Sequence, residues 1–200
     1  MPHLTRRALI TAAAATTLAT ALPAAALAEP VMEDVFLGAA DAPVTIIEYA
    51  SFTCPHCAAF HVNTWPEIKT RYVDTGKVRF VLREVYFDRF GLWASMVARC
   101  GGEAGYYPMA EQFLKRQDQW SRADDIAGEI QKIGRLNGLS AEQITACLGD
   151  QDYAKALIER YQTFATADDV RSTPTFLING EKQTGNMPAS DFAALIDKHL

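Results

Sequence analysis

The alternation of apolar and polar positions predicts two strands that flank a helical region in the first part of the chain. Val44–Ala50 (VTIIEYA) and Val78–Glu84 (VRFVLRE) are short β-rich runs. Residues 55–74 between them have a helical pattern with a restart, where we expect Thr64 to be the N-cap and Glu67 to reach back to it. A strand, a helix and a strand within about 40 residues predict a βαβ unit with parallel strands and a right-handed crossover.

The region from about Phe90 to Asp168 contains no convincing strand pattern and is predicted to be helical. Ser140 and Gln143 fit a capping box, and Leu139 and Ile144 flank it as a hydrophobic staple. Apolar residues recur at helical spacing in three sets, which are Trp93, Val97 and Cys100; Ile126, Ile130 and Ile133; and Leu157, Ile158, Tyr161, Phe164 and Ala165. We therefore expect a helical block of about 75 residues.

The last part of the chain returns to a β pattern. Thr175–Asn179 (TFLIN) predicts a strand, Asn179-Gly180 a turn, and Lys182–Thr184 a second, short strand. Pro188 then opens a final helix, whose apolar positions are Phe192, Leu195 and Ile196.

These elements predict an α/β fold with an inserted helical domain. Residues 29–88 and 170–200 would form the α/β domain, and residues 89–169 the all-helical insert. The 200 residues are 49% apolar and 22% charged, which excludes a disordered or collagen-like chain. The formal net charge is −5, so no nucleic acid is expected as a partner.

Residues 1–28 have the pattern of a secretory signal peptide. Arg6-Arg7 supplies a positive start, residues 8–28 carry no charge, and an A-x-A pattern places cleavage after Ala28. A transmembrane anchor is the alternative, but the run is only weakly apolar and Pro23 interrupts it. The paired arginines also occur in twin-arginine signals, so the export route stays open. Export would place the cysteines where disulfides persist.

Cys54-Pro55-His56-Cys57 follows the first predicted strand and begins the helix. This is the context in which a C-x-x-C motif indicates a redox site. A zinc site is the alternative, and it would need further ligands. Cys100 and Cys147 are far from this motif in the sequence, so His61 is the only candidate zinc ligand close to it. We therefore predict a redox dithiol, and we expect neither a metal nor a cofactor.

The positions of the two cysteines along the helix predict different roles. Cys54 would lie at the helix N-terminus, where free N–H groups and the macrodipole favour a thiolate. Cys57 would lie about one turn further in and be less exposed. His56, if cationic, would stabilise the Cys54 anion further, and the alternative is an exposed polar residue without a role. A stabilised thiolate is a good leaving group, so its disulfide is readily passed on.

Two further segments are candidates by their position. Glu48 is an acid inside the first strand, six residues before Cys54. We interpret it as a buried proton acceptor beneath the site that serves Cys57, and the alternative is a carboxylate at a solvated strand end.

Thr173-Pro174 precedes the strand TFLIN, where a proline is permitted, and local sequence leaves open whether its peptide bond is cis.

Together these residues resemble the DsbA-like thiol:disulfide oxidoreductases of the thioredoxin superfamily. The matching segments are VTIIEYASFTCPHC, WPEIK, GKVRFVLRE and STPTFLING. They cover both halves of the α/β part, with a helical insertion of the expected size between them. The resemblance implies a thioredoxin-like fold with a central sheet, flanking helices and a lid-like helical domain beside the active site.

The resemblance also implies roles for single residues. Cys54 would be the exposed nucleophile and Cys57 the buried resolving cysteine. Glu48 falls on the family's buried acid. Pro174 falls on the family's cis-proline, which faces the dithiol and, together with the preceding Thr173, offers groups to a bound peptide.

The chain departs from the enteric oxidases of this family at two places. Thr173 stands where those enzymes carry valine and some isomerases carry threonine, so the balance between oxidase and isomerase stays open. Residues 29–43 leave no room for the dimerisation domain of the isomerases, and we expect a monomer.

Cys100 and Cys147 are extra, and they resemble the second, structural disulfide of alphaproteobacterial members; the alternative is two buried free thiols.

The resemblance leads to the prediction of a periplasmic enzyme that introduces disulfides into exported proteins. Its substrates would be unfolded exported polypeptides with free thiols, and a DsbB-like membrane quinone reductase would reoxidise it. One alternative is a disulfide isomerase or reductase that a different membrane partner keeps reduced. Another is a chaperone that carries copper(I) on the two thiolates.

Overall fold

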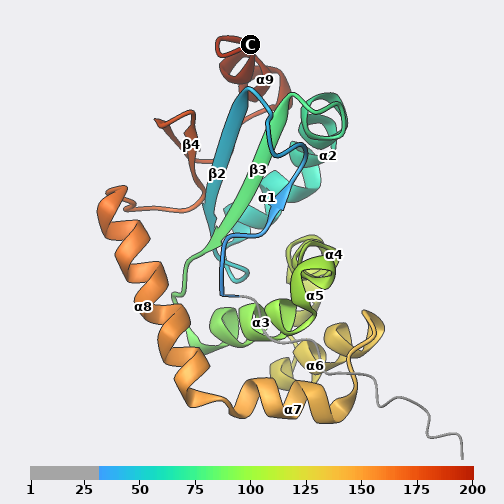
Figure 1. Cartoon of the computed structure of the whole chain (residues 1–200). Coiled ribbons are helices and arrows are strands. Elements are labelled where there is room, and N and C mark those ends of the chain that lie inside the picture. The colour runs from blue at the N-terminus through green and yellow to red at the C-terminus, as the bar shows by residue number, and fades with distance from the viewer. Residues whose placement is uncertain (1–31) are drawn as a thin grey trace, which may run out of the picture.

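A five-stranded sheet forms the centre of the computed structural model, which describes residues 32–200 (Figure 1). The strand order is β1-β3-β2-β4-β5. The strands are β1 (Phe36–Leu37), β2 (Val44–Ala50), β3 (Val78–Glu84), β4 (Thr175–Ile178) and β5 (Glu181–Thr184). The predicted signal peptide and its cleavage site lie outside the described residues. Within residues 32–200, no helix combines the length and apolarity needed to span a membrane.

β2 and β3 have the predicted bounds and run parallel, with Val44 opposite Val78. Most residues of both strands are buried because helices cover the sheet, although β3 also carries Arg79, Arg83 and Glu84. β4 is antiparallel to β2 and places Phe176 opposite Glu48. β2 is therefore the central strand, with direct hydrogen-bonded neighbours on both sides. Its C-terminal end leads straight into the CPHC segment.

The predicted break at Thr64 is present, but the predicted cap is wrong. The connection between β2 and β3 consists of α1 (Pro55–Asn63), α2 (Trp65–Ile68) and the π-helical turn η1 (Lys69–Val73). Thr64 has helical backbone angles, and its side chain makes no capping hydrogen bond. Its hydroxyl instead donates to Met187 O at 2.7 Å, and Glu67 pairs with Arg71. A contact with the loop before α9 (Ala189–Asp197) thus replaces the local cap.

Six helices form the insertion between β3 and β4. They are α3 (Arg89–Cys100), α4 (Gly102–Lys115), α5 (Gln117–Trp120), α6 (Ile126–Leu136), α7 (Ala141–Gly149) and α8 (Gln151–Ala167). In Figure 1, α3–α7 gather beyond the C-terminal ends of β2 and β3, and α8 returns towards β4. The predicted capping box of Ser140 and Gln143 is confirmed at the start of α7. Leu139 and Ile144 are both buried in the main core cluster.

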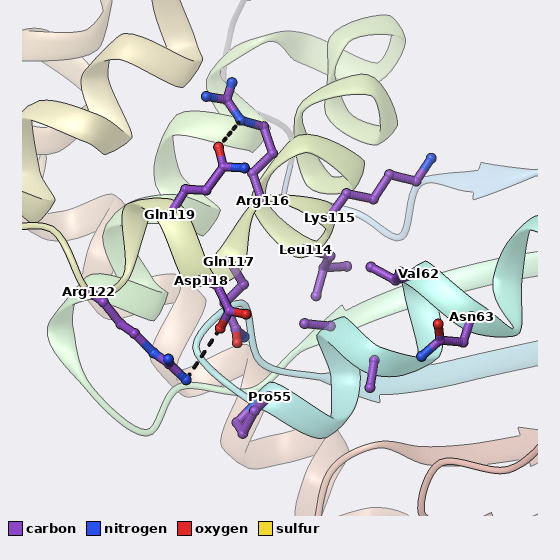
Figure 2. Close-up of a pocket in the computed structure, with 12 residues that line it drawn as sticks. Pro55, Val62, Asn63, Leu114, Lys115, Arg116, Gln117, Asp118, Gln119 and Arg122 are labelled. Carbon is purple, nitrogen blue, oxygen red and sulfur yellow. Dashed lines mark hydrogen bonds and ion pairs between the residues drawn. The ribbon is translucent and has the colours of Figure 1, made fainter.

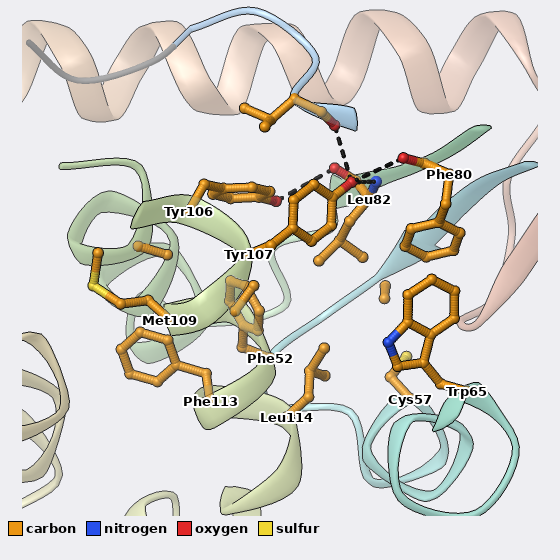
Figure 3. Close-up of a cluster of buried hydrophobic side chains, with 14 of the residues drawn as sticks. Phe52, Cys57, Trp65, Phe80, Leu82, Tyr106, Tyr107, Met109, Phe113 and Leu114 are labelled. Carbon is orange, nitrogen blue, oxygen red and sulfur yellow. Dashed lines mark hydrogen bonds between the residues drawn. The ribbon is translucent and has the colours of Figure 1, made fainter. Parts of the chain in front are cut away.

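Tyrosine side chains from α4 join the insertion to the sheet (Figure 3). The Tyr107 Oη lies 2.9 Å from Val35 O and accepts a hydrogen bond from Leu82 N–H at 3.1 Å. Beside it, the rings of Trp65 and Phe80 pack with their centroids 4.1 Å apart. The hydroxyl satisfies backbone groups that would otherwise be buried without partners, so it fixes α4 against the β1–β3 edge.

A buried ion pair fixes the orientation of α3 relative to the end of β3. Arg99 donates to Glu84 Oε1 and Oε2, each at 2.7 Å, and the Tyr106 hydroxyl donates to Glu84 Oε1 at 2.7 Å. Arg99 and Tyr106 have no exposed surface. Loss of one charged partner from such a pair costs about 3–5 kcal/mol, because the other charge stays buried.

Polar contacts tie α8 to the opposite face of the sheet. Arg83 of β3 donates to Asp34 at 2.9 Å, and its guanidinium lies 3.9 Å from the centre of the Phe164 ring in α8. The Tyr49 hydroxyl of β2 donates to Asp168, the residue that directly follows α8. The insertion is therefore anchored to the sheet at both of its ends.

The edge strand β1 is missing from the sequence-based prediction. It is only two residues long and pairs antiparallel with β3, so it is too short to show a period. The chain turns directly after it at Gly38, which has a φ of 92°. A Cβ at this position would lie 2.2 Å from Val78 O, so the turn requires glycine.

Cys100 and Cys147 form a disulfide that joins α3 to α7. Their Cα atoms lie 6.3 Å apart, and the residues are 47 positions apart in the sequence. The pairing implied by the family resemblance is confirmed, and the alternative of two buried free thiols is wrong. The disulfide closes a loop that contains most of the insertion.

Replacing both cysteines, as Cys100→Ala/Cys147→Ala, should lower the free energy of unfolding by about 4 kcal/mol, because the unfolded chain regains the entropy of the open loop. Denaturant unfolding of both proteins, with the Cys54–Cys57 disulfide closed in each, measures this difference. An unchanged unfolding midpoint would show that the bridge does not stabilise the fold.

Candidate active site

The CPHC segment lies where β2 passes into α1. Cys54 is the N-cap of α1, with φ −84° and ψ 118°, and Pro55 is the first helical residue. A tight turn places Cys54 there, since the Cys54 N–H donates to Ser51 O at 3.1 Å. The Cys54 side chain makes no capping hydrogen bond to the backbone. The N-terminus of α1, with its unpaired N–H groups, thus lies at Cys54 and favours negative charge on its sulfur.

The pKa of the Cys54 thiol is lowered to about 5. The largest contribution is a hydrogen bond from the Cys57 thiol, which stabilises the Cys54 thiolate. Burial acts in the opposite direction, and hydrogen bonds from the Thr173 side chain and from the backbone N–H groups of Cys57 and His56 lower the pKa further. The His56 side chain is exposed, and its electrostatic role stays a prediction.

Cys57 has the opposite character. It has no exposed surface, and burial raises the pKa of its thiol strongly. The hydrogen bond to Cys54 and the charge of Glu48 raise this pKa further. The prediction that Cys54 is exposed is wrong, because Cys54 is buried with 6% of its surface accessible; it is only more accessible than Cys57. At neutral pH the site therefore contains a thiolate at Cys54 and a thiol at Cys57.

Glu48 lies beneath the dithiol and is completely buried, so the alternative of a solvated strand end is wrong. Its Oε2 is 2.8 Å from Nε2 of His61, which is 2% exposed. The zinc alternative considered His61 as a ligand, but this nitrogen is occupied by Glu48. Among residues 32–200, no three side chains of His, Cys, Asp or Glu are gathered so that they could hold a metal ion. The role of Glu48 as proton acceptor stays a prediction.

The Thr173-Pro174 peptide bond is cis and lies opposite the dithiol. Cys54 Sγ is 3.6 Å from Thr173 O, although the two residues are 119 positions apart. The Pro174 carbonyl is occupied by a hydrogen bond from Gly185 N–H at 2.8 Å. The pairing of β4 with β2 brings this segment to Cys54, as the family resemblance implied.

Asp88 is a residue of the site that the sequence analysis missed. Its Oδ1 caps α3 by accepting hydrogen bonds from Phe90 N–H and Gly91 N–H at 2.8 and 2.9 Å. Its Oδ2 accepts a hydrogen bond from the Thr53 hydroxyl at 2.7 Å. Asp88 thus links the insertion to the residue directly before Cys54. An aspartate before a helical pattern is a recognisable N-cap signal, but the contact with Thr53 has no local signal.

A groove of about 460 Å³ opens beside the CPHC segment (Figure 2). Pro55 and Val62 of α1 line one side, and Leu114 and Gln117 lie on the side of α4 and α5. Val62 is half exposed. Gln117 also donates to Phe52 O at 2.9 Å, so α5 supports the loop that carries Cys54.

Comparisons with known proteins agree with this geometry. A family model described as Thioredoxin matches residues 31–198. The crystal structure of alpha-DsbA1 from Wolbachia pipientis superimposes with a TM-score of 0.77 and 30% sequence identity, covering 84% of this chain and 92% of that one. The chain belongs to the DsbA-like branch of the thioredoxin family. The predicted fold class, a thioredoxin-like sheet with an inserted helical domain, is thereby confirmed.

Other relatives extend this result. A protein of Rickettsia bellii, named as a protein-disulfide oxidoreductase, is 36% identical over 168 residues. The alignment covers 84% of this chain and 64% of that protein, so the chain spans just under two thirds of this relative's length. BdbD from Bacillus subtilis shares the fold, with a TM-score of 0.75 at 19% identity.

Removing the thiol of Cys57 tests how this DsbA-like site lowers the Cys54 pKa. Cys57→Ala should raise the pKa of Cys54 by about one unit, because the largest stabilising hydrogen bond is lost. Cys57→Ser keeps a donor and should give the smaller change. Thiolate absorbance of the two variants as a function of pH gives both values. Equal values for the two variants would show that the helix terminus acts without help from Cys57.

Proposed function

We propose that the protein is a thiol:disulfide oxidoreductase that transfers its Cys54–Cys57 disulfide to pairs of thiols in other polypeptides. The contrast between the two sulfurs carries this proposal: the pKa of Cys54 is about 5, whereas that of Cys57 is raised. Such a difference defines which sulfur exchanges with a partner and which one closes the ring. The names of the relatives support the same activity.

The reaction has two exchange steps. A substrate thiolate attacks Cys54 Sγ, the Cys54–Cys57 bond breaks, and Cys57 leaves and takes up a proton. A second substrate thiolate then attacks the substrate sulfur of the mixed disulfide, and Cys54 leaves as a thiolate. The substrate is oxidised by two electrons, and the enzyme's disulfide is reduced to the thiolate and the thiol.

The low pKa of Cys54 favours the oxidising direction. Stabilisation of the Cys54 thiolate stabilises the reduced enzyme relative to its disulfide, so the disulfide is readily given up. Cys54 keeps 6% of its surface accessible and lies against Thr173, next to which an extended substrate segment would lie. The groove beside Pro55 provides further surface next to the reacting sulfur.

We place this activity in the periplasm, on the basis of the signal-peptide pattern in residues 1–28. The substrates would be unfolded exported polypeptides with free thiols. A DsbB-like membrane quinone reductase would accept the two electrons and restore the Cys54–Cys57 disulfide. The enzyme would act as a monomer.

Thr173 favours a second candidate activity, disulfide isomerisation. Its side chain adds to the stabilisation of the Cys54 thiolate, which is the form that attacks incorrect disulfides. An isomerase would have to be held in the reduced state by a different partner. The two activities differ in which redox form of the protein is active on a substrate.

The reduction potential of Cys54–Cys57 should lie well above the value of about −270 mV of thioredoxin, because the thiolate is stabilised in the reduced form. Equilibration with glutathione buffers, followed by thiol trapping and mass measurement, gives this potential. The oxidised protein should also form the disulfide in a reduced two-cysteine peptide in one turnover. A potential near that of thioredoxin would contradict the oxidase proposal and favour the reductase.

The stability difference between the two redox forms should depend on pH. The pKa of Cys54 is about 5 in the folded protein and about 8.5 in an unfolded chain, so its stabilising contribution is fully present above pH 8.5. The contribution is lost as the pH falls through 5. At neutral pH the Cys54 thiolate contributes about 2 kcal/mol to the free energy of unfolding of the reduced form, after allowance for solvent screening.

Unfolding curves of the reduced and oxidised forms between pH 5 and 9 test this dependence, with Cys100–Cys147 closed throughout. We expect the free energy of unfolding of the reduced form to increase with pH relative to that of the oxidised form. A difference that stays constant over this range would mean that the Cys54 thiolate has no special stabilisation in the fold.

A further inference from the structure

A second buried ionisable residue lies beneath the dithiol, and the reaction described above gives it no role. His61 lies on the same face of α1 as Cys57, one helical turn further along, because residues four positions apart face the same way. It is 2% exposed, and its ring packs against the ring of Trp65 at a centroid distance of 5.7 Å. α1 thus carries both the resolving cysteine and the residue that contacts Glu48.

Glu48 and His61 are both buried, and each has one polar side-chain atom without a hydrogen-bond partner. Glu48 Oε2 and His61 Nε2 are 2.8 Å apart. Glu48 Oε1 and His61 Nδ1 are buried, and neither has a hydrogen-bond partner among the described residues. An unpartnered buried polar atom is costly, so its retention calls for a functional explanation.

We propose that His61 is a positioning residue that holds the Glu48 carboxylate so that its free oxygen exchanges a proton with Cys57. In this arrangement the Nε2–H of His61 donates to Oε2 and fixes the carboxylate plane, which leaves Oε1 free for the Cys57 thiol. This inference rests on the proposed function. It explains why a histidine is buried at this position, where an apolar side chain would fill the same space.

The proton balance of the site follows from this arrangement. When the enzyme is reoxidised, Cys57 gives its proton to Glu48 Oε1, and the Cys57 thiolate attacks Cys54 Sγ in the mixed disulfide. The Cys54–Cys57 bond forms, the bond to the partner sulfur breaks, and the partner leaves as a thiolate that carries the two electrons. In the oxidation of a substrate, Glu48 returns the proton to Cys57. His61 keeps its own proton in both directions.

The general chemistry of buried carboxylates supports a need for the donor. A carboxylate without a hydrogen-bond donor in an apolar interior takes up a proton and cannot then accept another. Cys57 precedes His61 by one turn on the same face of α1, and His61 contacts Glu48, so the carboxylate lies near the thiol and its charge raises the pKa of Cys57. A donor on the far oxygen leaves the near oxygen available for the thiol.

Single-turnover reaction of the reduced enzyme with oxidised glutathione separates the two sulfur steps. Attack by Cys54 gives a glutathione adduct, and attack by Cys57 removes it. Acid quenching and intact-mass measurement follow the adduct over time. His61→Phe keeps an aromatic ring against Trp65 but removes the donor. His61→Gln keeps an N–H donor and is the matched control.

We expect His61→Phe to slow the loss of the adduct about tenfold, which is the value of one hydrogen bond to a charged group, and to leave its formation unchanged. His61→Gln should restore most of the rate. Glu48→Gln should slow adduct loss about 100-fold, as expected for loss of an acid–base group. Adding His61→Phe to Glu48→Gln should then have no further effect, because the group that His61 positions is gone.

Three outcomes would overturn the proposal. Equal slowing of adduct formation and loss in His61→Phe would mean a structural role only. An unchanged rate of adduct loss, in either His61→Phe or Glu48→Gln, would mean that the pair takes no part in the Cys57 step. Multiplicative losses in the double variant would mean that the two residues act independently. A reducing potential in the glutathione equilibrium would contradict the oxidase proposal alone, because the comparison of rates among variants does not depend on it.

Discussion

The low pKa of Cys54 depends on the hydrogen bond from the Cys57 thiol and on the position of Cys54 at the N-terminus of α1, and the rest of the site is arranged around these two sulfurs. The tight turn after β2 puts Cys54 at the helix terminus, and the helical repeat then puts Cys57 one turn deeper. The same helix therefore stabilises an anion at one sulfur and buries the other. The two cysteines therefore differ in reactivity because they lie three positions apart at the start of one helix.

The order of strands supplies the remaining partners of the dithiol. β2 is central, so it has β3 on one side and β4 on the other. β4 brings Thr173 and Pro174 against Cys54, and β2 itself carries Glu48 beneath Cys57. The contact of Thr173 with Cys54 would not exist without the pairing of β4 with β2. The polar contacts from Asp88 and Gln117 then hold the loop before Cys54 from the side of the insertion.

Local patterns in the sequence predict β2 and β3 with their bounds, because both are short runs rich in β-branched and aromatic residues. The capping box of Ser140 is equally local. The Cys100–Cys147 pairing came from the family resemblance, since spacing alone does not determine which cysteines meet.

Local sequence patterns do not indicate several contacts between segments that are apart in the sequence. The Thr64 hydroxyl bonds to Met187, 123 positions away, and this contact replaces the cap that the local motif predicts. The contacts of Glu48 with His61 and of Asp88 with Thr53 are invisible for the same reason. Each depends on the packing of a helix against the sheet and not on any spacing that a linear pattern displays.

The place of the insertion in the chain has a consequence for the order of folding. β2 and β3 are close in sequence, but β4 pairs with β2 only after the whole helical block has been passed. Pairing between such distant segments is slow to form, because the loop-closure entropy must be overcome first. Thr173 therefore reaches Cys54 late, and β2 gains its second neighbour only then. Until β4 docks, Cys54 lacks the contribution of Thr173 to its low pKa, and its full reactivity is acquired only when the fold is complete.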